Sequence, residues 1–384
     1  MTIQSGSGGF LGFRLTEARE AMGLSVVHLA NLLGLSRTIV HEYENGSRSP
    51  SMVTLNRIYM VLDQPETFFY QAQPVSGFSH QDVHFRARDA LRDDLREQAG
   101  VRLKWLMELY DVLEHKLELP SVRLPELDVP RDLTCITQDH IEQAAGALRE
   151  LWKLGDVPLP NLIRLIELNG GVVGQINLDL PALDGLSFWS HQKRRPYILL
   201  NADKASYVRS RFDAGHELGH MILHRNIVEG VTKGTPLYKQ LEDQAHRFAG
   251  ALLLPRESWL SDIKKPSLAD FKRLKPKWKA SIGAMIMRAA TLGLISEIEK
   301  VNLFKQYRRR TWHTREPFDD AWELERPHLL TQATTMLFES GYSSLVFSQW
   351  FPRRAEHTVE LTGLPKAYFE MNHLPIKSIP SGMN

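Results

Sequence analysis

A pair of histidines one helical turn apart is the feature of this 384-residue chain that most clearly could do chemistry. His216 and His220 flank Glu217 in the segment FDAGHELGHMILH. On a helix this HExxH spacing places both imidazoles on one face, about 6 Å apart along the axis, where both can bind one Zn²⁺. Glu217 can then act as a general base on a water molecule. Because the motif occurs by chance in roughly 4% of chains of this length and composition, a third ligand must be found.

The best candidate for the third ligand is Glu242, which lies 22 residues after His220. Its segment, LEDQAHRFAGALLLP, has the apolar spacing of a second helix. Glu242 and His246 share a stripe of small residues on that helix, and a buried glutamate is rare unless it is paired or bound to metal. This pattern favours Glu242 over the adjacent Asp243. Two histidines and one glutamate leave a fourth position for water, as a catalytic zinc site requires.

Two further histidines are given other roles by their spacing. His224 lies eight residues after His216. That separation is about 12 Å along a continuous helix, too far to share one ion. His246 follows Glu242 by one turn on the same face, where it is placed to contact the ligands or the substrate. The group that would stabilise an oxyanion stays open between His246 and Tyr238.

The N-terminal segment SVVHLANLLGLSRTIVHEYENG has the spacing of a helix-turn-helix. Gly34 suits the turn, and Ser36 is a good N-cap for the second helix. The outward face of that helix would meet base edges in the major groove. The side chains expected at double-stranded DNA are Ser36, Arg37, Thr38, His41 and Arg48. A helical hairpin for protein contacts is the alternative, because residues 1–75 hold five arginines and no lysine against six acidic residues.

A strongly basic segment follows the metal-site region. Residues 264–310 hold thirteen Lys or Arg and three acidic residues, a balance of +10 in a chain whose net charge is only +2. Basic side chains neutralise phosphates and aromatic rings stack on bases, so this segment is a candidate for binding nucleic acid. The alternative is a solvated helical face with Trp278 in the core. The residues in question are Lys272, Arg273, Lys275, Lys277, Trp278, Lys279, Arg308, Arg309 and Arg310.

The pattern along the chain predicts a mainly α fold with a small β-sheet (α+β), the sheet lying between residues 170 and 201. Residues 89–117 predict one long helix, broken or bent near Gly100. No apolar run is long enough for a transmembrane helix, and the lone Cys135 excludes an internal disulfide, so we expect a cytoplasmic protein without a membrane partner. The expected divisions are residues 1–75 for the helix-turn-helix bundle, 76–130 for the long helix and a Pro-rich linker, 131–262 for the metal-site domain, 263–320 for the basic helical segment and 321–384 for a C-terminal helical region.

Two family resemblances add to this interpretation. The run LANLLGLSRTIVHEYENGSRSPS resembles the XRE (Cro/C1-type) helix-turn-helix family. Residues 85–320 resemble the ImmA/IrrE zinc metallopeptidases in three pieces: RFDAGHELGHMILH, EDQAHRFAGALLLP and KWKASIGAMIMRAATLGLIS. The second resemblance implies a zincin-like core in which His216, His220 and Glu242 bind Zn²⁺ and Glu217 activates water. The chain departs from that family's pattern at two positions, with Asp213 for a usual threonine and His246 for a usual asparagine.

Together the resemblances imply a DNA-binding regulator that carries a zinc-dependent endopeptidase. The implied substrate is a partner protein, a helix-turn-helix repressor, cut in a response to stress, DNA damage or mobile elements, with single-stranded DNA as a candidate activator. Because such modules often pair on two operator half-sites, a homodimer is a candidate state. Two alternatives stay open: a non-catalytic transcription factor with a structural or sensory zinc, and an antitoxin-like regulator of its own operon.

Overall fold

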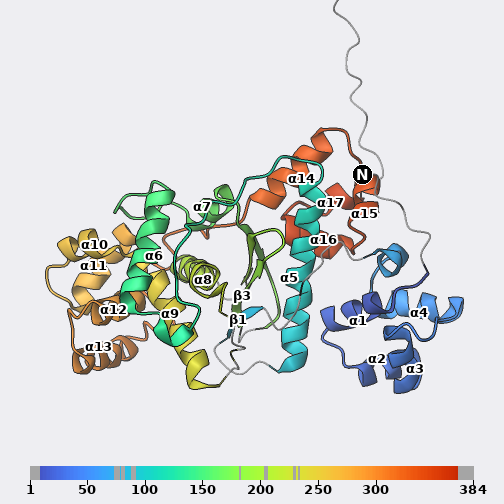
Figure 1. Cartoon of the computed structure of the whole chain (residues 1–384), viewed down its shortest axis with the longest axis horizontal. Coiled ribbons are helices and arrows are strands. Elements are labelled where there is room, and N and C mark those ends of the chain that lie inside the picture. The colour runs from blue at the N-terminus through green and yellow to red at the C-terminus, as the bar shows by residue number, and fades with distance from the viewer. Residues whose placement is uncertain are drawn as a thin grey trace, which may run out of the picture. The chain divides into compact units, whose positions relative to one another are not determined.

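The computed structural model describes residues 9–72, 78, 83–87, 92–180, 183–202, 206–227, 231 and 234–370. The chain forms two compact units (Figure 1). Unit 1 comprises residues 1–80, 92–119 and 328–384, and unit 2 comprises residues 81–91 and 120–327. These units cut across the boundaries expected from the sequence, because the long helix and the C-terminal helices share a unit with the helix-turn-helix.

The first part of unit 1 is the expected helix-turn-helix bundle. Three of its helices begin at a serine whose hydroxyl accepts a hydrogen bond from the backbone N–H three residues later: Ser25, Ser36 and Ser51. Gly34 ends the first of these helices in the left-handed conformation, with φ 63°, which glycine adopts without strain. The elements are α1 (Gly12–Ala21), α2 (Val26–Leu33), α3 (Arg37–Glu44), α4 (Met52–Leu62) and η1 (Glu66–Tyr70).

The second part of unit 1 contains the long helix, and here one expectation was wrong. Helix α5 (Asp93–Glu114) runs through Gly100 without a break. Gly100 is buried between Ala99 and Val101, and the packing of this buried stretch outweighs the helix penalty of about 1 kcal/mol for a glycine. The remaining helices of unit 1 are α14 (Leu329–Glu339), α15 (Ser344–Trp350), α16 (Ala355–Thr362) and α17 (Ala367–Glu370).

A buried cluster of charges joins the three chain segments of unit 1. The Arg14 guanidinium on α1 donates to Glu17 Oε1 at 2.8 Å and to Glu108 Oε1, on α5, at 3.0 Å. Arg353, from the loop before α16, pairs with the same Glu108 and lies 3.4 Å from Glu17 Oε1. Lys104 completes the cluster through Glu17. No member is more than 7% exposed, so each charge depends on its partners rather than on water.

We expect Arg353→Met to lower the free energy of unfolding of unit 1 by roughly 3–5 kcal/mol, because it removes one of the two guanidiniums that neutralise the buried Glu108 carboxylate. Urea unfolding followed by circular dichroism measures the change. Arg354→Met is the matched control: Arg354 is 43% exposed and its pair with Glu356 is at the surface, so an effect below about 1 kcal/mol is expected. Equal effects of the two variants would contradict the role of the cluster.

The same cluster predicts a dependence of stability on pH. Burial raises the pKa of Glu17, but Arg14, Arg353 and Lys104 outweigh it and hold that pKa at about 2, below the ordinary 4.5. A folded-state pKa below the unfolded one stabilises the fold above pH 4.5, and this contribution is lost as the pH falls towards 2. Unfolding monitored between these two pH values should therefore show stability declining. Glu17→Gln, although less stable overall, should show a flatter decline, and an identical slope would refute the assignment.

Unit 2 is built on a four-stranded sheet in the order β1-β3-β4-β2. Its strands are β1 (His84–Ala87), β2 (Val172–Ile176), β3 (Leu183–Ser190) and β4 (Arg195–Asn201). β3 and β4 form an antiparallel hairpin, β2 runs parallel to β4, and β1 adds to β3 antiparallel. The fold class is thus the expected one, mainly α with a small sheet. The sheet predicted over residues 170–201 accounts for three strands, whereas β1 was not foreseen because four residues carry no usable alternation.

In unit 2, α8 packs against β3, β4 and α9 (Figure 1). Helix α8 continues directly into η4, a single π-helical turn, and such turns are frequent at functional sites. The helical elements are η3 (Leu133–Cys135), α6 (Gln138–Leu151), α7 (Leu162–Leu168), α8 (Tyr207–Gly219), η4 (His220–His224), α9 (Pro236–Leu253), α10 (Arg256–Asp262), α11 (Leu268–Trp278), α12 (Ile282–Thr291) and α13 (Glu297–Arg309).

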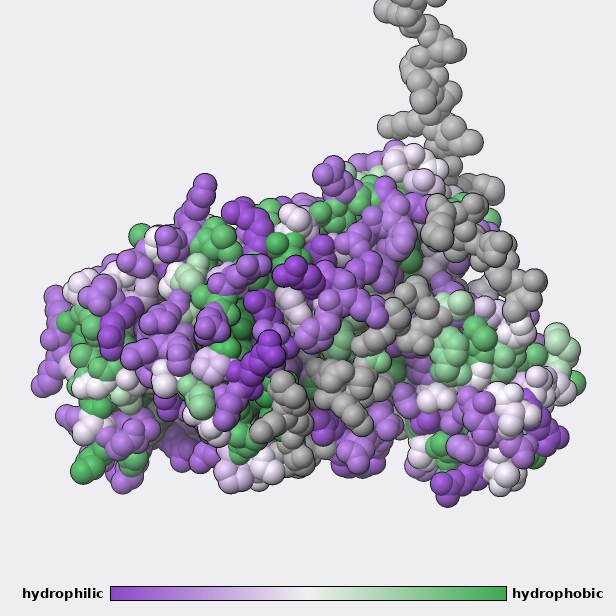
Figure 2. Space-filling view, in the orientation of Figure 1, coloured by the Kyte–Doolittle hydropathy of each residue, from purple (hydrophilic) through white to green (hydrophobic). Residues whose placement is uncertain are grey.

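The surface of the chain is mixed in character. Figure 2 shows hydrophilic residues over most of the face that it draws, with hydrophobic residues in small groups among them. Within the described ranges, none of the helices is both long and apolar enough to cross a membrane.

Candidate metal centre

The structure brings together the three side chains predicted to bind the metal. His216 Nε2 on α8 lies 3.0 Å from His220 Nε2 at the start of η4. Glu242 on α9 places Oε2 at 3.4 Å from His216 Nε2 and Oε1 at 3.5 Å from His220 Nε2. Two ligands of a tetrahedral zinc, each about 2.0–2.1 Å from the ion, lie roughly 3.4 Å apart. The three groups therefore fit a single Zn²⁺ with little adjustment.

His246 is a fourth potential donor at the same place. Its ring centroid lies 4.4 Å from that of His216, and one donor atom from each of His216, Glu242 and His246 falls within 4.8 Å of the others. His246 Nδ1 donates to the backbone carbonyl of Glu242 at 2.6 Å, which leaves Nε2 as the acceptor. We assign the ligand set to His216, His220 and Glu242 because their mutual distances are shorter. His246 then lies beside this proposed ligand set, and its role at the metal stays a prediction.

A chain of hydrogen bonds behind His220 fixes which of its nitrogens faces the ion. Gln244 on α9 donates from Nε2 to the carbonyls of Leu133 and Ile136, at 3.0 and 3.1 Å, so its Oε1 is the acceptor. His224 Nε2 donates to that Oε1 at 3.1 Å, and His224 Nδ1 accepts from His220 Nδ1 at 2.9 Å. His220 Nε2 consequently carries the lone pair that a metal requires. Burial, aided by the nearby His84, lowers the pKa of His224 to about 3, which keeps this ring neutral.

His224 is thus placed behind His220 and not among the ligands. Its part in the row of hydrogen bonds that orients His220 was not predicted from the sequence. The available signal was its spacing of four residues from His220, which puts the two rings on one helical face.

Gln244→Met tests whether these hydrogen bonds orient His220, because methionine has a similar size but cannot connect His224 to the two carbonyls. We expect zinc affinity to fall by roughly 10–100-fold, the usual effect of removing a partner that orients a ligand. Competition with a chromogenic chelator measures it. Gln240→Met is the matched control, since Gln240 also donates to the Leu133 carbonyl, at 3.3 Å, from the same helix. Unchanged affinity in Gln244→Met would show that the chain does not orient His220.

Strand β3 positions the predicted general base. Glu217 is fully buried, and its Oε2 accepts a hydrogen bond from the Ser187 hydroxyl on β3 at 2.6 Å. Gly185, two residues earlier on this strand, leaves space for the other carboxylate oxygen: a Cβ at position 185 would lie 3.4 Å from Glu217 Oε1. Ser187 was not predicted as a site residue, because the only available signal was a polar residue inside an apolar strand.

Strand β1 lies along the outer edge of β3, next to this base. Its backbone register pairs His84 with Ser187 and Arg86 with Gly185. The His84 ring stacks on the His220 ring, with centroids 4.8 Å apart and planes 7° from parallel. Burial lowers the pKa of His84 to about 4, so the ring is neutral at pH 7. A segment 136 residues earlier in the chain thus reaches the metal centre.

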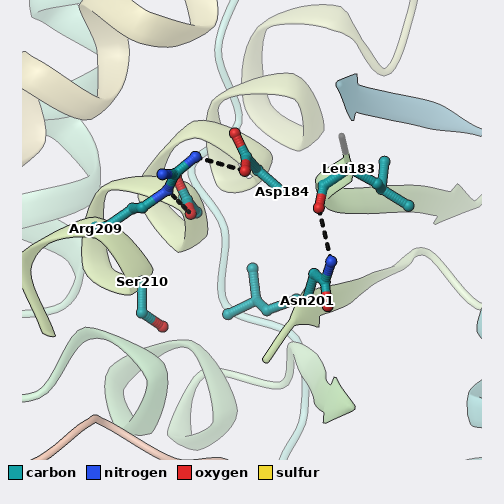
Figure 3. A pocket seen from close by; sticks show the side chains of 7 residues that line it. Leu183, Asp184, Asn201, Arg209 and Ser210 are labelled. Carbon is teal, nitrogen blue, oxygen red and sulfur yellow. Dashed lines mark hydrogen bonds and ion pairs between the residues drawn. The ribbon is translucent and has the colours of Figure 1, made fainter. Parts of the chain in front are cut away.

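Asp213, one of the two departures from the resembled family, serves the scaffold. Arg209, one turn earlier on α8, donates to Asp184 Oδ1 on β3 at 2.5 Å and lies 3.8 Å from Asp213 Oδ2 (Figure 3). In Figure 3 the Arg209 guanidinium points towards Asp184, and the Asn201 amide donates to the Leu183 carbonyl at 2.8 Å. The space between these groups is about 10 Å³, too small for anything larger than a water molecule. Asp213 therefore helps to tie α8 to the sheet.

The residues predicted to contact DNA lie on α3, at its N-cap, or just beyond its end. Arg37, Thr38 and His41 are exposed on that helix. The Ser36 hydroxyl caps it by accepting from the Ile39 N–H at 3.3 Å. Arg48 is 54% exposed and lies 3.3 Å from Glu42. No nucleic acid contact is tested by this arrangement, so the DNA-contact residues stay a prediction.

The basic segment contains two residues that cannot serve as predicted. Trp278 is buried and its indole N–H donates to Asp262 Oδ2 at 2.8 Å, so its ring is in the core, as the alternative had it. Lys275 is fully buried between Glu316 and Asp319, at 2.7 and 2.5 Å. The balance of +10 was misleading because these acidic partners lie outside residues 264–310.

The other predicted members of that segment divide into paired and exposed groups. Arg273 pairs with Asp270 at 2.6 Å, and Lys277 pairs with Asp262 at 2.6 Å. Lys279 lies over the Tyr207 ring at 5.5 Å. Arg273 and Lys277 are exposed as well as paired, and the other exposed members are Lys272, Arg308, Arg309 and Arg310. A nucleic-acid site in this segment would therefore have far fewer cations available than the sequence count suggested.

Comparison with known proteins accounts for both parts of the chain. Residues 11–67 match a family model described as a helix-turn-helix domain. Residues 168–290, which include all the metal-centre residues on α8, η4 and α9, match the Peptidase M78 model, described as the IrrE N-terminal-like domain. The chain joins a helix-turn-helix domain to an IrrE-like domain.

A relative of this two-domain chain comes from Thermoplasma volcanium, and its name describes an HTH-type transcriptional regulatory protein. It is 25% identical over 173 residues, which are 43% of this chain and 46% of the relative. The matched part thus spans less than half of either protein. The relative's name concerns regulation alone.

Proposed function

We propose that this protein is a DNA-binding transcriptional regulator whose IrrE-like domain is a zinc-dependent endopeptidase. The observation that carries the proposal is the placement of three donors, from α8, η4 and α9, within 3.0–3.5 Å of one another. They lie beside a buried glutamate that a strand hydroxyl orients. A purely structural zinc has no need of such a glutamate, and four protein ligands would close its coordination.

The residues divide the chemistry between them. When bound by His216, His220 and Glu242, Zn²⁺ supplies Lewis-acid chemistry, lowering the pKa of water and polarising a carbonyl. Glu217 accepts the proton that the attacking water loses and returns a proton to the leaving amine. Ser187 holds the Glu217 carboxylate in place by donating to Oε2. His246, with its Nε2 beside the ligands, is the candidate for contact with the attacked carbonyl oxygen. Because Nδ1 donates to the Glu242 carbonyl, Nε2 can donate to that oxygen only when the ring is protonated.

The wider role follows from the two domains together. Helix α3 would bind operator DNA in the major groove with the exposed residues predicted for it. The protein substrate, by family resemblance, is a helix-turn-helix repressor cut in a stress, DNA-damage or mobile-element response, with single-stranded DNA as activator and a homodimer as the DNA-bound form. A DNA-binding role places the protein with the DNA, in the cytoplasm.

The test uses the full-length protein. Its zinc content is measured by elemental analysis, and the zinc-loaded protein is incubated with a proteome-derived peptide library and with a co-encoded repressor, with and without single-stranded DNA. Mass spectrometry identifies any cut, and Glu217→Gln is the control. A protein without stoichiometric zinc would contradict the proposed metal site. Zinc with no cleavage in any arm would favour the non-catalytic regulator instead.

A further inference from the structure

A cavity of about 480 Å³ opens beside the metal centre, between α8, α9, α12 and α13. This volume is in the range of roughly 300–1,000 Å³ that ligand sites occupy in proteins. The side chains of Glu242 and His246 line one end, so the cavity is continuous with the metal centre. Its apolar walls are Phe212, Ala284, Met287 and Phe304.

Two arginines at the cavity have partners of their own, and Lys239 is a further cation among the lining residues. Arg247 pairs with Asp243 at 2.7 Å, both on α9. Arg288 is buried, with its guanidinium on the Glu142 carboxylate at 2.9 Å and on the Leu254 carbonyl at 3.0 Å. Because these two guanidiniums are already satisfied, they add little attraction for an acidic group, and the apolar walls favour an apolar one.

Gly250 keeps the cavity open at its floor. It lies inside α9, where glycine costs about 1 kcal/mol relative to alanine. Packing does not forbid a side chain there: the nearest atom to an added Cβ is Arg288 Cδ, at an ordinary 3.8 Å. A glycine that neither the backbone nor the neighbours demand is explained if the space that a side chain would fill must stay available.

We propose that this cavity is the subsite for a large apolar side chain of the substrate, such as Phe, Leu or Met, next to the bond that is cut. The proposal rests on the proposed function, because it takes the metal centre to be the place of cleavage. It adds the substrate class: a segment with a bulky apolar residue next to the scissile bond. Folded proteins bury such residues, whereas a hinge or an unfolded segment exposes them.

Two hydroxamates test the cavity without any cleavage. Acetohydroxamate and 3-phenylpropanohydroxamate bind zinc through the same group, but only the second carries a phenyl ring to place in the cavity. Titration calorimetry of the zinc-loaded protein should show the phenyl compound binding at least tenfold more tightly. Gly250→Leu, which fills the floor, and Met287→Glu, which puts a carboxylate on the wall, should both abolish that ratio while leaving acetohydroxamate affinity unchanged.

Met336→Glu is the matched control for the second variant. Met336 is 56% exposed on α14 of unit 1, against 43% for Met287, and it does not line the cavity. Circular dichroism verifies that each variant is folded. If Gly250→Leu does not fold, Met287→Glu still tests the cavity, because Met287 is at an exposed position. Equal affinities of the two hydroxamates for the wild-type protein would overturn the subsite. Failure of the peptidase proposal would appear separately, as absence of peptide cleavage.

A second inference rests on the position of β1. Residues 81–91 belong to unit 2, whereas the residues before 80 and after 92 belong to unit 1. The connection that leaves the helix-turn-helix bundle therefore contributes an edge strand to the metal-site domain. Since β4 occupies one side of β3, β1 occupies the other. Its register there runs past Ser187, which donates to the Glu217 carboxylate, and Gly185, which leaves space beside it.

An extended peptide binds proteins by adding a strand to an open sheet edge. The edge of β3 beside Glu217 is where a substrate peptide would do so. We infer that β1 is an internal strand that holds this place, so that a substrate must displace it to reach the metal centre. This inference also rests on the proposed function.

A reversible disulfide tests whether β1 must leave. Ala87 and Leu183 are paired in the register of β1 and β3, so Ala87→Cys with Leu183→Cys, in a Cys135→Ser background, would pin the strand when oxidised. A tripeptide hydroxamate should bind the oxidised protein at least tenfold more weakly than the reduced protein. Acetohydroxamate, which needs only the metal, should bind both equally. Equal affinity of the tripeptide compound for the two forms would overturn the inference.

Discussion

Replacing Glu242 by alanine should reduce the affinity of the protein for Zn²⁺ by a factor of several hundred. Zinc binding to sites of four protein ligands is worth about 10–16 kcal/mol, so each ligand contributes roughly 3–4 kcal/mol, and 1.4 kcal/mol is a factor of ten. Glu242 lies within 3.5 Å of both histidine nitrogens and has no substitute of equal proximity. Competition with a chelator of known affinity measures the loss.

Asp243→Ala is the matched control for this prediction. Asp243 is the adjacent carboxylate, and it pairs with Arg247 at 2.7 Å on the outer side of α9, where its side chain is 43% exposed. Its removal should leave zinc affinity unchanged. The opposite pattern, with affinity lost in Asp243→Ala and kept in Glu242→Ala, would show that the ligand set has been assigned to the wrong residue.

The features predicted from the sequence are those that local periodicity controls. The HExxH spacing is a property of one helical turn, and the choice of Glu242 over Asp243 depended on which face of a single helix is apolar. The structure places both residues accordingly, with Glu242 inside and Asp243 outside. Ser36 caps α3 for an equally local reason.

The features that were missed depend on contacts between distant parts of the chain. Ser187 reaches Glu217 across 30 positions, and Gln244 reaches the carbonyls near η3 across more than 100. The buried cluster of unit 1 joins Arg353 to Glu108 across 245 positions. No periodicity in a single sequence reports which polar residue will face which, because the pairing is decided only when the elements pack.

The basic segment was overestimated for the same reason: its partners lie elsewhere in the chain. Counting charge over residues 264–310 treats every lysine and arginine as solvated. Lys275 is instead neutralised inside the fold by Glu316 and Asp319, just beyond that window. Only those charged side chains that folding leaves without an internal partner are available to bind another molecule.

Glu217→Gln should reduce peptide cleavage by about a thousandfold, within the roughly 10²–10⁴-fold that a positioned general base contributes. The amide has the shape of the carboxylate and still accepts from the Ser187 hydroxyl, so the site keeps its geometry, but it cannot take a proton from water. Zinc affinity should be close to that of the wild-type protein, which separates this effect from the loss expected of Glu242→Ala.

Ser187→Ala provides the graded comparison. It keeps the base but removes the 2.6 Å hydrogen bond that orients it. A hydrogen bond to a charged group contributes about 1.5–3 kcal/mol, so cleavage should fall by roughly 10–100-fold, less than in Glu217→Gln. Initial rates on one cleaved peptide, at saturating zinc, rank the three proteins. If Glu217→Gln cleaved as fast as the wild-type protein, another group would have to take the proton, and the buried carboxylate beneath β3 would be a structural feature alone.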